Sequence, residues 1–242
     1  MKRGLSLAAL LAALAVALPG PGAEEKKDNT PPKGFKALFN GKDFDGWQGS
    51  IQIDKRLKLE GEGLEEAQKA ANKKVLPHWT VEDGVLINDG QGGNLATTKD
   101  YGNFELWVDW KIEPKGDSGV YLRGEPQVQI WDSDSLDPKK YPNDLGKGSG
   151  GLWNNVKDKF PLKKADKEPG EWNTFFIVIK GDKVTVKLNG ELVVDGVALE
   201  NIWERNKPLP DKGPIELQSH PKQDGKFGKI TFKNIYVKEL SE

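Results

Sequence analysis

Apolar and polar residues alternate along much of this chain, most clearly between Phe104 and Ile112. Successive side chains of a strand point to opposite faces, so this alternation predicts a strand with one buried face. Residues 117–132 repeat the pattern as two short strands joined by a turn. Near the end of the chain the phase changes at Lys233-Asn234, which predicts a β-bulge within the last strand.

The rest of the pattern predicts further short strands separated by turns. Asp83-Gly84 and Asn189-Gly190 each separate two apolar runs, as in tight hairpins. Residues 171–180 are apolar at nearly every position, which predicts a central strand covered on both faces. Residues 57–74 break the pattern, and Leu64 to Lys74 predicts a short exposed helix inserted at the domain edge. The expected fold is all-β, a two-sheet antiparallel jelly-roll sandwich with one short helical insertion.

The N-terminal residues have the composition of a targeting segment. Lys2 and Arg3 precede an apolar run, Leu5 to Leu18, that is too short to span a bilayer. We expect residues 1–23 to be a secretory signal peptide and residues 24–33 a polar, disordered linker. Residues 34–242 are then a single domain. The protein is expected to be exported to the periplasm, the cell surface or the medium, with no membrane span.

Composition narrows the chemistry that the chain can perform. A net charge of -1 over 242 residues gives no electrostatic basis for binding nucleic acid. The chain has no cysteine, which excludes disulfides, thiolate metal sites and a cysteine nucleophile. Its only histidines, His78 and His220, exclude a His-rich metal cluster. A weak oxygen-and-imidazole site for a divalent metal is chemically feasible but unsupported, so we expect no cofactor and no metal ligands.

Two predicted strands, within residues 117–132 and 213–220, carry polar side chains on one face. They are Arg123, Gln127 and Gln129 on the first strand, and Glu216, Gln218 and His220 on the second. If both strands lie in one sheet, these side chains line a pocket with a cation, amides, a carboxylate and an imidazole. The alternative is a solvated outer face with a coincidental histidine.

The candidate catalytic residues are His220, Arg123, Glu216 and Asp117. His220 has a side chain that exchanges protons near neutral pH, so it is the preferred acid–base residue. Glu216 or Asp117 can share that work if burial raises its pKa. Arg123 is always charged and offers forked donors, so it can hold an oxygen that develops negative charge.

Amide and aromatic side chains are the candidates for binding a hydroxyl-rich ligand. They are Gln127, Gln129, Gln218, Tyr121, Trp131 and Trp153. An aromatic plane presents apolar area to the C–H face of a sugar ring. Trp153 lies in the long Gly-rich loop of residues 133–170, and loops of this length are often functional. The alternative for Trp153 is that it folds back and pins this loop.

An ordered set of motifs across residues 34–240 resembles the bacterial 3-keto-disaccharide hydrolase family. In order, the motifs are FNGKDFDGW, WTVEDGVL, KDYGNFELWVDWKI, GDSGVYLRG, PQVQIWD, GEWNTFFIVIKGDKVTVKLNGELVVD, GPIELQSH and FKNIYVKEL. The family is also described as a 3-keto-glucoside 1,2-lyase and 3-keto-2-hydroxyglucal hydratase domain. The resemblance implies a concanavalin-A-like, or laminin-G-like, jelly roll.

The resemblance also implies a reaction on small carbohydrates that a partner oxidoreductase has already oxidised at C3. The 3-keto group acidifies the C2 proton, a base removes it, and the leaving group departs from C1. Water then adds to the unsaturated sugar, so the net result is glycoside hydrolysis. Such chemistry needs a base and an oxyanion stabiliser.

This chain departs from the family pattern at one position that matters for catalysis. Many members have Tyr-Glu-Val-Gln where this chain has Pro126-Gln127-Val128-Gln129. Because an amide cannot act as a base, the resemblance leaves that role to His220, Glu216 or Asp117. A non-catalytic, lectin-like carbohydrate-binding module of the cell envelope is the alternative function.

Overall fold

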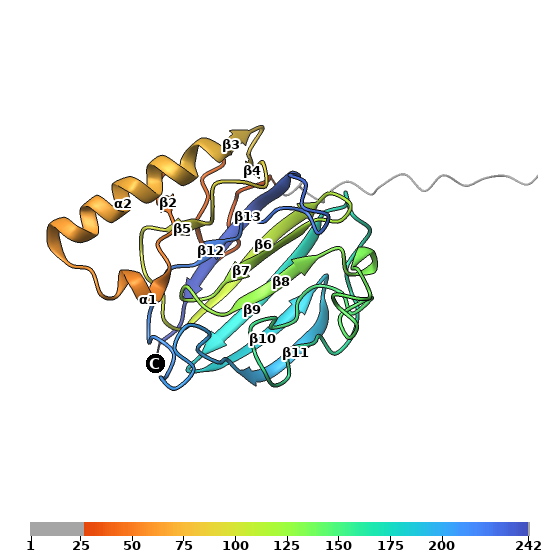
Figure 1. Cartoon of the computed structure of the whole chain (residues 1–242). Helices are drawn as coiled ribbons and strands as arrows, with labels where there is room; N and C mark the ends of the chain where they lie inside the picture. Colours follow the sequence, from red (N-terminus) through yellow and green to blue (C-terminus); the bar gives the residue numbers. More distant parts are fainter. Residues whose placement is uncertain (1–26, 242) are drawn as a thin grey trace, which may run out of the picture.

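The computed structural model describes residues 27–241, which form two antiparallel β-sheets packed face to face as a jelly-roll sandwich (Figure 1). The larger sheet consists, in spatial order, of β11 (Glu191–Ala198), β10 (Lys183–Leu188), β9 (Asn173–Lys180), β6 (Phe104–Ile112), β13 (Ile230–Glu239), β4 (Val85–Asn88) and β3 (Trp79–Glu82), with β1 (Lys36–Ala37) also paired to β13. The smaller sheet consists of β2 (Trp47–Gly49), β5 (Leu95–Thr97), β12 (Glu216–Leu217), β7 (Asp117–Tyr121) and β8 (Gln127–Trp131). The predicted fold class is therefore confirmed.

The core lies between the two sheets and is built from the alternate apolar positions. In β6, buried and half-buried residues alternate from Phe104 to Ile112, as its sequence predicts. In β9 the prediction of cover on both faces is wrong. Every second residue from Thr174 to Val178 is only half-buried, so this face of the strand is partly open to solvent. Phe176 instead packs against the neighbouring Trp107, with ring centroids 5.2 Å apart.

The predicted helical insertion is present and longer than expected. It comprises the short helix α1 (Ile53–Arg56), α2 (Gly61–Val75) and a 3₁₀ turn at Leu76–His78. Helix α2 lies against β2, where Asn72 Oδ1 accepts a hydrogen bond from Gly49 N at 2.8 Å. A Cβ on Gly49 would lie 2.6 Å from the Ala71 carbonyl, so glycine permits this close approach. The insertion is thus fixed to the edge of the smaller sheet (Figure 1).

The last strand carries the predicted bulge and binds the start of the described chain. The register between β13 and β6 shifts between Lys233 and Tyr236, which confirms the bulge. Asn29 N donates to Asn234 Oδ1 at 2.6 Å, and Lys233 pairs with Asp28 at 2.7 Å. The C-terminal part of the expected disordered linker, residues 27–33, is therefore held against the sheet by these contacts. The expected signal peptide, residues 1–23, lies outside the described residues.

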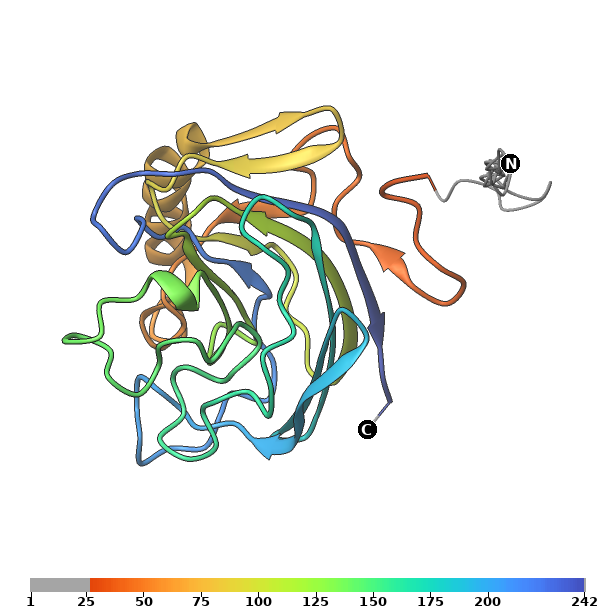
Figure 2. The same cartoon turned by 90° about the vertical axis from the view of Figure 1, so that its right-hand side faces the viewer.

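The long connections lie on one side of the sandwich. In Figure 2 the strands of the larger sheet curve along the right-hand side, and the loop of residues 133–170 lies on the opposite side. This loop contains only one short 3₁₀ turn, Ser133–Ser135, as its composition predicts. Within residues 27–241, no helix is both long and apolar enough to cross a membrane.

Candidate active site

The two polar strands recognised in the sequence are neighbours in the smaller sheet. Strand β12 pairs with β7 so that Glu216 lies opposite Tyr121, and β7 pairs with β8 so that Tyr121 lies opposite Gln127. Gln218 extends this alignment, because its backbone N donates to Gly119 O at 2.9 Å. The apolar positions of these strands face the core, so the polar side chains share the opposite face. The predicted juxtaposition of these two strands is confirmed.

This polar face is buried, not solvated. Gln127 and Gln129 are each 3% exposed, and they form a hydrogen-bonded row that leads to Asp117. Gln127 Nε2 donates to Gln129 Oε1 at 2.6 Å, and Gln129 Nε2 donates to Asp117 Oδ1 at 2.9 Å. A Cβ on Gly119 would lie 2.6 Å from Gln127 Oε1, so glycine makes room for the row. The two glutamines therefore support the site from beneath instead of lining an open pocket.

A pocket of about 240 Å³ opens beside this row, at the junction of the smaller sheet and the helical insertion. Its lining residues are Ser50, Gln52, Asn94, Tyr121, Gly124, Trp203, Glu216 and Gln218. The volume lies below the about 300–1,000 Å³ of pockets for drug-sized ligands, so the pocket suits a small ligand such as one sugar ring.

Glu216 is the buried titratable group of this pocket. It is 3% exposed, and desolvation of its carboxyl raises the pKa to about 7. The Asn94 and Ser50 side chains oppose this shift because they favour the charged carboxylate. Asn94 Nδ2 donates to Glu216 Oε2 at 3.0 Å, while Oε1 has no hydrogen-bond partner among residues 27–241. A carboxyl with a pKa near neutrality and one free oxygen is suited to accepting a proton.

The groups beside Glu216 complement a ligand with hydroxyl and carbonyl groups. Burial raises the pKa of Tyr121, so its phenol stays protonated and can donate a hydrogen bond. Gln218 Nε2 lies 3.4 Å from the Tyr121 oxygen, and Gln218 Oε1 has no partner within the described part of the chain. Buried polar atoms without partners are uncommon, and a ligand that fills the pocket can supply the missing bonds.

Asp117 and His220 lie beside each other outside this pocket. His220 Nδ1 lies 3.6 Å from Asp117 Oδ2, and burial raises the pKa of Asp117 against the opposing effect of His220. The His220 side chain is 48% exposed, and its Nδ1 lies 2.7 Å from the Pro221 carbonyl oxygen. Neither Asp117 nor His220 lines the pocket that holds Glu216.

Arg123 is not part of the pocket that holds Glu216. Strand β7 ends at Tyr121, and Arg123 adopts a left-handed φ of 55°, so the alternation that predicted its direction no longer applies. Its guanidinium donates to Gly102 O at 2.8 Å and to Asn103 Oδ1 at 3.2 Å. The side chain lines a separate cleft with Asp182 and Asp211. The predicted grouping of Arg123 with Glu216 and His220 is therefore wrong.

Trp131 and Trp153, the predicted stacking rings, pack against each other. Their centroids are 4.9 Å apart in an edge-to-face arrangement, and Trp131 Nε1 donates to Gly148 O at 2.8 Å. Lys159 Nζ lies 3.9 Å from the Trp153 ring centroid. These contacts correspond to the alternative recognised for Trp153, in which it pins the loop.

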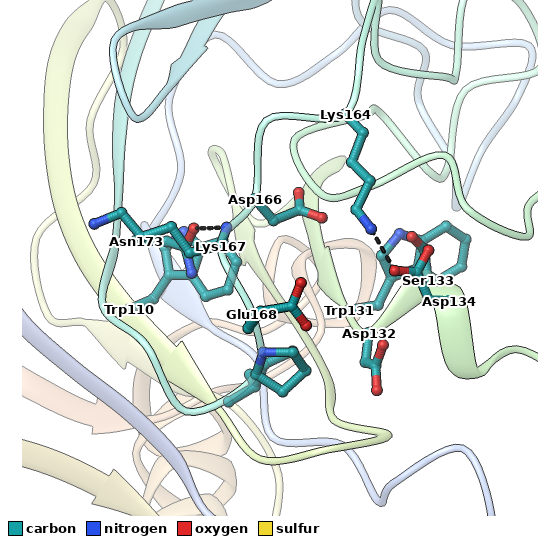
Figure 3. A pocket seen from close by; sticks show the side chains of 12 residues that line it. Trp110, Trp131, Asp132, Ser133, Asp134, Lys164, Asp166, Lys167, Glu168 and Asn173 are labelled. Atoms are coloured by element: carbon teal, nitrogen blue, oxygen red, sulfur yellow. Dashed lines mark hydrogen bonds and ion pairs between the residues drawn. The ribbon is translucent and has the colours of Figure 1, made fainter. Parts of the chain in front are cut away.

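A small cavity beneath this loop is lined by acidic side chains (Figure 3). Asp166 accepts a hydrogen bond from Ser149 N at 2.6 Å, and Asp134 pairs with Lys164, so these carboxylates are already engaged. The cavity of about 20 Å³ has room for about one water molecule. Across residues 27–241, no three His, Asp or Glu side chains are grouped closely enough to hold a metal ion.

Several pocket residues were not recognised in the sequence. Ser50, Gln52 and Asn94 lie in connections between elements, and Trp203 lies in the connection between β11 and β12. No periodicity marks such positions, because a loop residue's direction depends on the particular turn that holds it. Trp203 offers one signal in the sequence, because it is a large aromatic residue in a polar connection. In the structure the residue is 41% exposed.

Comparisons with known proteins identify a matching family, a related sequence and similar solved structures. Residues 34–238 match the family described as the 3-keto-alpha-glucoside-1,2-lyase-like domain. A 3-keto-disaccharide hydrolase from Bacteroides thetaiotaomicron is 25% identical over 252 residues, covering 86% of this chain and 79% of that protein. A "putative glycosyl hydrolase" from Parabacteroides distasonis has a TM-score of 0.60 at 25% identity, covering 89% of this chain and 100% of that one. A further structure of that description and organism has a TM-score of 0.54 at 28% identity, covering 68% and 91%.

Proposed function

Because the chain belongs to the family of 3-keto-alpha-glucoside-1,2-lyase-like domains, we propose that it cleaves 3-keto-glucosides by elimination and hydration, with Glu216 as the base. Family membership supports a hydrolase-class enzyme over a lectin-like module. The observation that carries the assignment of the base is the Glu216 carboxyl, buried in a pocket with one oxygen unpartnered among the described residues.

The first step is removal of the C2 proton by the Glu216 carboxylate. The electron pair of the C–H bond is delocalised into the 3-keto group, whose oxygen becomes negatively charged. The Tyr121 hydroxyl and the Gln218 amide are the donors available to stabilise this oxygen. The C1–O bond then breaks, a C1=C2 double bond forms, and the aglycone leaves as its oxygen takes a proton from a water molecule.

The second step is addition of water to the unsaturated sugar. Glu216, now protonated, returns a proton to C2 while the hydroxide left by that water molecule adds at C1, so the carboxylate is regenerated. Asn94 holds one carboxyl oxygen at 3.0 Å throughout, which leaves the other to exchange the proton. The sum of the two steps is hydrolysis of the glycosidic bond.

This proposal assigns the base differently from the sequence-based preference for His220. The imidazole is half exposed and does not line the pocket. We therefore expect His220→Ala to retain kcat/KM within about threefold, because the variant removes a half-exposed side chain that lies outside the pocket. Steady-state kinetics on a 3-keto-glucoside would measure this, and a loss of about 100-fold or more would return the role of base to His220.

The pH dependence of the reaction should follow the Glu216 carboxyl. A base must be unprotonated in the free enzyme, so kcat/KM is expected to rise with pH and to level off above about 7. An ordinary exposed glutamate would give a plateau above about pH 5. A profile that is flat from pH 5 to 8 would contradict the assignment of Glu216.

The function itself is tested by incubating the protein with a 3-keto-glucoside and measuring release of the aglycone. Elimination through C2 also predicts that deuterium from D₂O enters at C2 of the sugar product. Binding without release of aglycone would instead support the lectin-like alternative. The assay is run with and without a chelator, so that any contribution of a divalent metal is measured separately.

We further propose that the protein acts after an oxidoreductase and outside the cytoplasm. The proposed reaction requires a sugar already oxidised at C3, so an enzyme that oxidises that hydroxyl must supply the substrate. The basic residues Lys2 and Arg3 and the apolar run that follows support export. Mass spectrometry of the exported protein would test cleavage after residue 17 or 23.

A further inference from the structure

Trp203 lies at the mouth of the pocket. It is 41% exposed, whereas Glu216 in the same pocket is 3% exposed. Of the pocket's two aromatic residues, Tyr121 is 8% exposed and occupies a buried position in β7. Trp203 is therefore the aromatic surface that a ligand meets where it leaves the pocket.

The turn that carries Trp203 is held by a buried carboxylate. Glu125 Oε2 accepts hydrogen bonds from Ile202 N at 2.7 Å and from Trp203 N at 3.4 Å. Asn201 Oδ1 accepts a further bond from Trp203 N at 3.1 Å. Glu125 lies in the turn between β7 and β8, so this contact fixes the Trp203 segment to the smaller sheet.

Glu125 has no cationic partner within 4 Å in residues 27–241. It is 2% exposed, and the nearby Arg205 pairs instead with Glu200 at 2.9 Å. Burial of the carboxyl raises its pKa, while the backbone N–H groups of residues 202 and 203 oppose that shift. A buried carboxylate is unfavourable unless donors compensate it, and here the backbone donors come from the turn that carries Trp203.

We propose that Trp203 is the stacking surface for the second sugar of a disaccharide substrate, and that Glu125 is the residue that positions it. The proposal rests on the proposed function, in which the oxidised ring occupies the pocket beside Glu216. A pocket of about 240 Å³ holds one ring, so the sugar linked through C1 extends past the mouth. An indole face at that mouth offers apolar area to the C–H face of the outer ring.

The test compares two substrates that differ only beyond the glycosidic oxygen. For Trp203→Ala, we expect kcat/KM on a 3-keto-maltose to fall about tenfold more than kcat/KM on methyl 3-keto-α-glucoside. Trp172→Ala is the matched control, because Trp172 is a partly buried tryptophan that lines a different cavity. Equal loss on both substrates, or no loss on either, would overturn the proposal.

Variants of Glu125 test its positioning role. Glu125→Ala removes the acceptor and is expected to raise KM for the 3-keto-maltose several-fold while leaving kcat on the methyl glycoside nearly unchanged. Glu125→Gln keeps one acceptor oxygen and should restore part of this selectivity. If Glu125→Ala lowers kcat on both substrates equally, the residue supports the fold in general and does not position Trp203.

Calorimetric titration with unoxidised maltose separates this proposal from the proposed function. Weaker maltose binding by Trp203→Ala than by the wild-type protein supports the stacking surface, even if no 3-keto-glucoside is cleaved. In that case the proposed reaction fails and the binding surface stands. If maltose binds equally to both proteins, or to neither, the role of Trp203 is overturned whatever the catalytic result.

Discussion

Glu216→Gln is expected to lower kcat/KM on a 3-keto-glucoside by about 10²–10⁴-fold, the range typical of a lost acid–base group. The amide keeps the size of the carboxyl but cannot take the C2 proton. Exchange of that proton with D₂O should be lost together with aglycone release, because both depend on the same step. Retention of exchange with loss of release would show that Glu216 acts later than proton removal.

The thermal stability of Glu216→Gln tests whether this variant still folds normally. The Glu216 pKa is about 7 in the folded protein and about 4.5 in an exposed chain, so the folded state binds more protons between these values. Stability contributed by the neutral carboxyl is therefore fully present below about pH 4.5 and lost as pH rises to about 7. The loss is on the order of 3 kcal/mol. Thermal unfolding at pH 8 should show Glu216→Gln to be at least as stable as the wild-type protein.

Gly213→Ala is expected to destabilise the fold by about 3 kcal/mol, which lowers the Tm by roughly 6–12 °C. A Cβ at residue 213 would lie 2.2 Å from the Arg123 carbonyl oxygen and 2.6 Å from its carbonyl carbon. Both are backbone atoms, so no side-chain rotation relieves the clash. Gly213 also exchanges two backbone hydrogen bonds with Tyr101, at 2.8 and 3.1 Å, which limits its own movement.

Gly63→Ala is the matched control for this substitution. A Cβ at Gly63 meets no atom within 4 Å, and the residue lies in the first turn of α2. Alanine favours a helix over glycine, so the Tm should stay the same or rise slightly. Differential scanning calorimetry of the two variants decides the matter, and a Gly213→Ala protein that melts within 2 °C of wild type would refute the steric argument.

Regular strands were predictable because their chemistry repeats at a fixed spacing. The alternation in β6, β7 and β8 identified which side chains face the core, and the polar face of β12 could be matched to that of β7. The sandwich and the neighbourhood of Glu216, Gln218 and Tyr121 follow from that spacing. The burial of this polar face could not be predicted from the spacing, because the residues that cover it belong to loops and to the helical insertion.

The incorrect predictions concern residues that lie beyond the ends of the regular strands. The direction of Arg123 was inferred by continuing the alternation two residues beyond the end of β7, into a left-handed backbone conformation. His220 was likewise placed by extending β12, whose paired residues are only Glu216 and Leu217. The position of Trp203 depends on its contact with Glu125. These residues are 78 positions apart, so no local sequence pattern indicates the contact.

The position of β13 within the larger sheet has a consequence for how the chain is made. This strand is the last in sequence, yet it lies between β6 and β4 and pairs with both. Until residues 230–239 leave the ribosome, the larger sheet exists as two unconnected parts with exposed edges. The larger sheet therefore forms only once residues 230–239 are available, and a chain that lacks β13 cannot join β6 to β4.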